Sequence, residues 1–100
     1  MRIDWDEQKE RRNWRKHRVR FDVAERVFED HHAVTTQDRV VAGEARWQTI
    51  GIVPISTGGA MILVVVHTVE DEDDNELIRL ISARRADAYE RKIYEAAQKK

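Results

Sequence analysis

The sequence predicts one α+β domain: two helices, then an antiparallel meander of three or four strands, then a C-terminal helix. Three observations lead to this prediction. The first glycine is Gly43 and the only proline is Pro54, so nothing breaks a helix near the start. The middle of the chain holds apolar, β-branched runs separated by turn residues, and the last thirteen or so residues again have helical periodicity. A length of 100 residues is that of one domain, which we assign to residues 1–100.

The first predicted helix covers residues 4–18. One side of it carries a residue at every fourth position: Trp5, Lys9, Asn13 and His17. Each step advances about 400°, so these side chains stay on one side of the helix. A second, short helix is predicted to begin at an Asp22 N-cap, because Glu25 three residues later completes a capping-box pattern.

Strands are predicted from His31 onward. They cover residues 33–36, 46–53, 60–68 and 77–82. The run 60–68 is apolar at almost every position, which is typical of a central strand covered on both faces. The polar stretch 37–43, the residues around Gly58-Gly59 and the acidic stretch 70–76 are predicted as loops or turns.

The last predicted helix covers residues 87–99. Asp87 and Glu90 lie at its start, and Lys99 and Lys100 lie at its end, as the helix dipole favours. With the strands before it, this helix completes the α+β order of elements.

Charge is distributed unevenly along the chain. Residues 1–20 carry eight Lys and Arg against four Asp and Glu, residues 21–78 three against twelve, and residues 79–100 seven against three. The net charge of −1 therefore hides two basic ends and an acidic middle. If the ends meet in the fold, they form one basic surface, as expected of a protein that binds a polyanion. Charges that only solvate helix faces give the same count.

Other classes of protein are disfavoured. The chain has no cysteine, so neither a disulfide nor a thiol contributes. The start of the chain has no apolar signal core, and the longest apolar run, 60–66, is too short to cross a bilayer. We therefore expect a soluble, cytoplasmic protein. His31 and His32 are adjacent and point to opposite faces of a strand, so we expect no metal site, and no motif indicates another cofactor.

Several side chains are of the types that cleave RNA without a metal ion. That reaction needs a base for the 2′-hydroxyl, an acid for the leaving 5′-oxygen and cations for the charge that builds on the phosphate. His17 and Glu44 can exchange protons, and the Trp5 ring can stack an unpaired base. The cations that can bind phosphate are Lys9, Lys16, Arg46, Arg79 and Arg84.

Each of these residues also has a structural interpretation. Trp5 can anchor the first helix on the core, and His17 can complement the dipole at the helix C-terminus. Lys9 and Lys16 can be plain surface charges.

The strand residues have structural interpretations too. Arg46 can pair with Glu44, two positions away on the same strand face, and Arg79 can pair with the acidic turn. Arg84 lies at the junction of the last strand and the last helix, where we expect an exposed side chain that contributes little to folding. His67, at the end of the most buried strand, is interpreted as structural.

The whole pattern resembles the BrnT family, ribonuclease toxins of bacterial toxin–antitoxin pairs. The order and spacing of the matching positions make the resemblance specific over nearly the whole chain. They are Trp5-Asp6, Lys9, Asn13, Lys16-His17, Val19, Phe21, Ala24, Val27-Phe28, Asp30, Glu44, Arg46, Ile50-Gly51, residues 63–68, Ile78-Arg79, Ile81-Ser82-Ala83-Arg84, Ala86, Glu90-Arg91 and Tyr94.

The resemblance implies a RelE-like fold, cleavage of messenger RNA, and a cognate antitoxin with a ribbon-helix-helix DNA-binding domain. Operator DNA would then be bound only through the toxin–antitoxin complex. Carried over to this chain, the catalytic candidates are His17, Glu44, Arg46, Arg79 and Arg84, and the RNA-binding candidates are Trp5, Lys9 and Lys16.

Two features depart from the family pattern, the residue after His17 and the unusually charged acidic stretch 70–76. Arg18 follows the histidine where such chains usually have glycine, which would suit a helix end with positive φ. The rival hypothesis is a non-catalytic module of the same fold that binds protein or nucleic acid.

Overall fold

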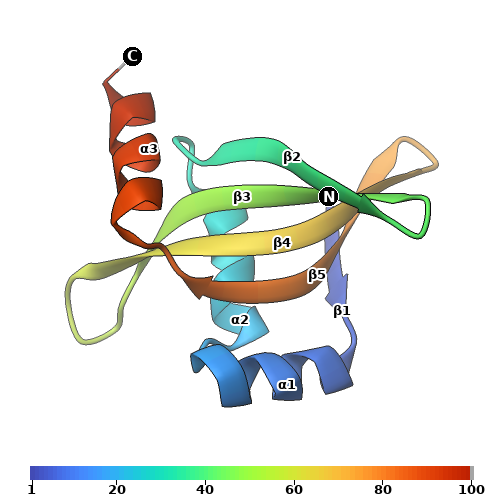
Figure 1. The fold of residues 1–100 in the computed structure, drawn as a ribbon, viewed down its shortest axis with the longest axis horizontal. Helices are drawn as coiled ribbons and strands as arrows, with labels where there is room; N and C mark the ends of the chain where they lie inside the picture. Colours follow the sequence, from blue (N-terminus) through green and yellow to red (C-terminus); the bar gives the residue numbers. More distant parts are fainter. Residues whose placement is uncertain (100) are drawn as a thin grey trace.

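The computed structural model describes residues 1–99 as a five-stranded sheet with helices on both of its faces (Figure 1). In chain order the elements are β1 (Arg2–Trp5), α1 (Glu7–His17), α2 (Phe21–Ala24), the 3-10 helix η1 (Glu25–Glu29), β2 (Val34–Val41), β3 (Glu44–Pro54), β4 (Ala60–Glu72), β5 (Asn75–Arg85) and α3 (Ala88–Gln98). The prediction for Lys100 lies outside the described residues. None of the helices in residues 1–99 is long and apolar enough to span a bilayer.

The α+β class is confirmed, but the sheet is larger than predicted. Strands β2 to β5 form a four-stranded antiparallel meander, and the full order is β1-β5-β4-β3-β2. The additional strand β1 pairs in parallel with β5, with Ile3 opposite Ile78. A sheet predicted as purely antiparallel is therefore mixed. Four residues are too few for strand alternation to stand out in the sequence.

Two apolar cores lie on opposite faces of the sheet. The larger one packs α2, η1 and Val19 against one face. Gly51 on β3 permits the close approach of η1, because a Cβ at this position would lie 2.9 Å from the Val27 Cβ. The smaller core lies on the other face, where Tyr94 of α3 packs on Ile50 and Val64. Helix α3 covers only one end of this second face (Figure 1).

The first helix is shorter than predicted. Asp6 is its N-cap, with Oδ1 accepting a hydrogen bond from the Gln8 backbone N–H at 2.7 Å. Trp5 therefore belongs to β1 rather than to the helix. At the other end Arg18 adopts φ +58° and its backbone N–H donates to the Trp14 carbonyl, which is a left-handed helix end formed without glycine.

Asp22 is not the N-cap of the second helix. Arg20 is the cap residue, and its side chain makes no capping hydrogen bond. Instead the Glu10 carboxylate, on α1, accepts a hydrogen bond from the Phe21 backbone N–H at 2.8 Å. A residue from another helix thus satisfies the first free N–H of α2, which begins one residue before the predicted Asp22 cap.

Two predicted loops are mostly strand. The polar stretch 37–43 belongs largely to β2, which is the exposed edge strand, so polar residues are tolerated on both of its faces. In the acidic stretch 70–76, only Asp73 and Asp74 form the turn, with φ +47° and +70°. Two successive residues with positive φ are typical of a two-residue hairpin turn.

Two predictions made from local pattern are confirmed. The last helix begins where predicted, since Asp87 is the N-cap of α3; its capping box with Glu90 was not part of the prediction. His67 is buried at 1% exposure; its ring contacts Thr49 Oγ1 at 2.7 Å and the Thr68 carbonyl at 3.1 Å. This histidine is a structural residue of the core.

Candidate functional site

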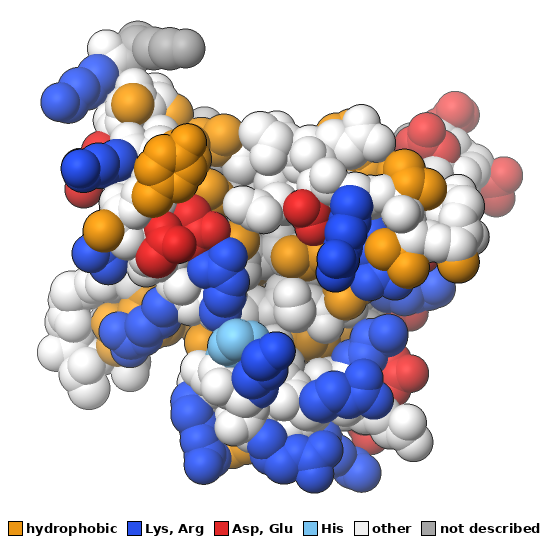
Figure 2. Space-filling view, in the orientation of Figure 1, with side chains coloured by type: hydrophobic (Ala, Val, Ile, Leu, Met, Phe, Trp, Pro, Cys, Tyr) orange, Lys and Arg blue, Asp and Glu red, His pale blue; other side chains and the backbone are white. Residues whose placement is uncertain are grey.

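A groove of about 460 Å³ lies between α1 and the sheet. Its lining holds five cations, one imidazole and no carboxylate. The lining residues are Lys9, Arg12, Asn13, Lys16 and His17 from α1, Ile81, Ser82 and Arg84 from β5, and Arg46 from β3. Figure 2 shows Lys and Arg side chains gathered over α1 and up to the sheet, with a histidine between them. A groove with this charge favours a polyanionic ligand.

Asn13 fixes the helix side of the groove to the strand side. Its Nδ2 donates to the carbonyls of Val19 at 2.9 Å and Ala83 at 2.8 Å, and its Oδ1 accepts from the Ala83 backbone N–H at 2.9 Å. The side chain is only 5% exposed. Because Lys9 and His17 lie one turn before and after Asn13, this contact sets their position over β5.

His17 is the imidazole of the groove. It ends α1, where a helix dipole alone would favour the charged form. Burial nevertheless lowers the pKa of His17, and the charges of Lys16 and Arg84 lower it further. The neutral ring is therefore favoured at neutral pH, which is the form that can accept a proton.

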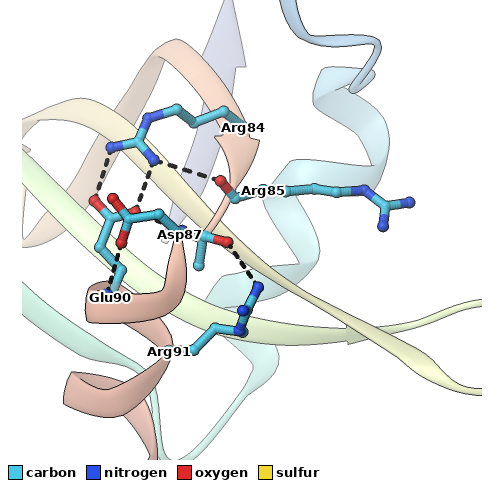
Figure 3. A network of polar contacts seen from close by, with 6 residues as sticks. Arg84, Arg85, Asp87, Glu90 and Arg91 are labelled. Atoms are coloured by element: carbon cyan, nitrogen blue, oxygen red, sulfur yellow. Dashed lines mark hydrogen bonds and ion pairs between the residues drawn. The ribbon is translucent and has the colours of Figure 1, made fainter.

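Arg84 makes the strongest ion pair of the site, with Glu90 of α3 (Figure 3). The two guanidinium nitrogens Nη1 and Nη2 each contact a carboxylate oxygen at 2.7 Å. Their hydrogen bonds raise the pKa of Arg84 and hold the pKa of Glu90 below its ordinary value. The Arg84 side chain is 39% exposed and that of Glu90 11%. Arg84 is therefore not the free surface residue that we expected from sequence, while the Arg85 side chain points away from this network.

Arg46 brings a cation from the acidic middle of the chain to the groove. Its Nε is buried and has no hydrogen-bond partner within residues 1–99. The pairing with Glu44 that the sequence suggested is absent from the ion pairs of the described residues. Glu44 lies exposed at the start of β3 and does not line the groove.

Two further candidates lie outside the groove. Trp5 packs edge-on against Phe21, with 6.0 Å between ring centroids, and contributes to the larger core. Arg79 is exposed on β5 opposite Thr68, and it forms no ion pair with the acidic turn among the described residues. Of the eight candidates, the groove brings together Lys9, Lys16, His17, Arg46 and Arg84.

Sequence reasoning missed three features of the groove. Arg12 lies three positions after Lys9 and four before Lys16, a helical spacing that could have placed it on the same side. Asn13 was recognised as part of the stripe but not as the contact that holds α1. Glu90 was read only as a helix-start residue, and nothing local indicated its pairing with Arg84.

Within residues 1–99, no three His, Asp or Glu side chains gather closely enough to hold a metal ion. The groove residues offer one imidazole and cations, which are not a ligand set for a divalent metal. Metal independence of the chemistry stays a prediction.

A cationic groove with one neutral imidazole, on a small α+β domain, fits the class of proteins that bind and process nucleic acids. The family model described as "Ribonuclease toxin, BrnT, of type II toxin-antitoxin system" matches residues 5–90. The chain therefore belongs to the BrnT family of ribonuclease toxins, and the resemblance found in the sequence is confirmed. No curated protein matches the chain.

Proposed function

We propose that this toxin cleaves messenger RNA in the groove between α1 and β5, by a metal-independent endoribonuclease reaction. The observation that carries the proposal is the placement of His17 among five cations in one groove. Family membership supports ribonuclease activity, and the groove supplies the groups for it. Glu44 and Arg79 have no step in this mechanism, because neither lines the groove.

His17 is the general base. Its neutral ring takes the proton from the 2′-hydroxyl of the nucleotide, and the 2′-oxygen then attacks the adjacent phosphorus. The lowered pKa of His17 keeps the ring neutral at physiological pH, so the base is available without prior deprotonation.

The cations stabilise the charge that builds on the phosphate. Arg46 and Arg84 approach from the sheet, and Lys9 and Lys16 approach from the helix. As the bond from phosphorus to the 5′-oxygen breaks, an ammonium group of Lys9 or Lys16 gives the proton to that oxygen. The products are an RNA with a 2′,3′-cyclic phosphate and an RNA with a free 5′-hydroxyl. Such fixed cations act most strongly where charge develops in the transition state.

The biological setting follows from the family. A type II toxin has a protein antitoxin, and we propose one with a ribbon-helix-helix domain that carries the complex to operator DNA. The toxin would act in the cytoplasm, where messenger RNA is translated, and would have a RelE-like fold.

Expression of the chain without antitoxin tests this function. We expect arrested growth and fragmented messenger RNA, and the purified protein should cleave RNA in the presence of EDTA. Normal growth with intact transcripts, despite soluble folded protein, would favour the rival hypothesis of a non-catalytic binding module. Activity abolished by EDTA and restored by Zn²⁺ or Mg²⁺ would contradict the metal-independent mechanism.

A further inference from the structure

Two arginines contact one indole ring outside the groove. The guanidinium carbon of Arg20 lies 4.4 Å from the centroid of the Trp14 ring, and that of Arg18 lies 5.3 Å from it. Trp14 is half-buried, while both arginines are exposed. The ring thus fixes two flexible cations at one place, at the C-terminal end of α1.

Neither arginine forms an ion pair with the part of the chain that the structure describes. Within residues 1–99 the ion pairs of arginines involve Arg2, Arg26 and Arg84 only. The carboxylate of Glu10, on the same helix, is engaged with the Phe21 backbone N–H. Two like charges near one ring repel each other, and a bound anion reduces that repulsion.

The backbone at Arg18 adopts a conformation that is unusual for arginine. The residue has φ +58°, a conformation that glycine adopts far more readily than arginine. The chain therefore places a cation beside Trp14 at a position that backbone geometry alone would give to glycine.

This cluster is connected to the groove by other cations. On α1, Arg11 and Arg15 lie roughly 200–240° around the axis from Lys9. Arg12 and Lys16 lie between the two sides, so cations continue around the exposed side of α1. Figure 2 shows several Lys and Arg side chains over the visible face of α1, whereas acidic side chains lie at the far end of the sheet and beside α3.

We propose that Trp14, Arg18 and Arg20 form a second phosphate-binding site, which holds the backbone of single-stranded RNA where it leaves the cleavage groove. The inference rests on the proposed function, since the groove holds the cleaved segment of the same RNA. A phosphate between the two guanidinium groups accepts hydrogen bonds from both. The site has no base-reading group, so it adds affinity without sequence preference.

The test compares short and long RNA on a double variant, Arg18→Gly with Arg20→Gln. Glycine suits the backbone of position 18, so folding is preserved, as a urea titration checks. The probes are 2′-O-methylated, uncleavable oligonucleotides of about four and about sixteen nucleotides. The control is Lys92→Gln with Lys99→Gln, which removes the same charge from two exposed residues, one on α3 and one at its C-cap.

For the long oligonucleotide we expect the dissociation constant of the double variant to rise at least about fivefold. The slope of log K against log salt concentration should become shallower by about 0.7, because one phosphate contact is lost. The double variant should bind the short oligonucleotide as tightly as the parent does. The control variant should bind both oligonucleotides as tightly as the parent does. If the parent and the double variant bind long RNA equally, the second phosphate-binding site is wrong, while the proposed cleavage in the groove still stands. If only antitoxin binding weakens, the surface belongs to the antitoxin and the inference is wrong. If the parent binds neither oligonucleotide, the proposed function fails as well.

Discussion

Arg84 has two roles at the residue scale. It is a cation of the groove, and it is the partner of Glu90, whose side chain is 11% exposed. Removing Arg84 leaves a mostly buried carboxylate without its counter-ion, which is more destabilising than the loss of an exposed arginine.

Arg84→Ala should lower the rate of RNA cleavage at least tenfold, because a fixed charge contact to a transition state is worth roughly 2–4 kcal/mol. It should also lower the free energy of unfolding by roughly 1–3 kcal/mol, a range that allows for solvent around the half-exposed guanidinium. Cleavage of a fixed RNA and urea titration measure the two effects.

Arg85→Ala is the matched control, since that exposed side chain points away from the ion pair (Figure 3). It should change the free energy of unfolding by less than about 0.5 kcal/mol. If Arg84→Ala cleaves RNA as fast as the parent protein, Arg84 has no part in the reaction.

The protonation of His17 predicts the pH dependence of cleavage. The base acts when neutral, and the pKa of His17 lies below its ordinary value of 6.5. The ratio kcat/KM should therefore rise with pH through a midpoint below 6.5 and be level near pH 7, because this ratio reports the free enzyme. A profile that falls as pH rises through this range would be incompatible with His17 as the base.

At the scale of elements, the groove depends on how α1 is held on β5. Asn13 makes two hydrogen bonds across this junction, both to the backbone of Ala83, and a third to the Val19 carbonyl in the segment that follows α1. These bonds are buried, so no water replaces them when the side chain is removed.

Asn13→Ala should lower the free energy of unfolding by roughly 2–4 kcal/mol, since it leaves buried backbone groups without partners. The rate of RNA cleavage should fall even at temperatures where the variant is folded, because Lys9 and His17 are no longer held in position over β5. Gln8→Ala, an exposed substitution on the same helix, is the control and should change stability by about 0.5 kcal/mol or less. Equal stability of the Asn13 variant and the control would show that α1 is held by other contacts.

Elements with their own local signals were predictable from sequence, and those set by tertiary contacts were not. The buried run of β4 and the capping box of α3 are each formed by residues that lie close together in the sequence. By contrast, the start of α2 depends on Glu10, eleven positions before Phe21. The edge strand β2 is polar because solvent covers it, so its sequence resembles a loop.

At the scale of the whole molecule, the parallel pairing of β1 with β5 brings the two basic ends of the chain together. Because β1 lies at the edge beside β5, the helix that follows it lies next to the end of β5, where Arg84 leads into α3 (Figure 1). The acidic hairpin between β4 and β5 lies at the far end of the sheet. Charge counts predicted two basic ends, but only the strand pairing explains why they meet.

The groove itself was partly predictable. Lys9, Lys16 and His17 follow from helical spacing, and Arg84 follows from its place at a strand–helix junction. Arg46 comes from the acidic middle of the chain. Alternation along its strand does not predict which residues of α1 and β5 lie near it. Trp5 was predicted to bind RNA from the first helix. In the structure it belongs to β1, a strand that was not predicted, and it packs on Phe21.

The central claim is that RNA is cleaved in this groove with His17 as the base. In its most direct test, purified parent protein and the folded His17→Ala variant are each incubated with a defined RNA in EDTA. The ends of the RNA products are then analysed. The account predicts fragments with 2′,3′-cyclic phosphate and 5′-hydroxyl ends from the parent, formed about 10²–10⁴ times more slowly by His17→Ala. Equal cleavage by the two proteins, or fragments with 5′-phosphate ends, would contradict it.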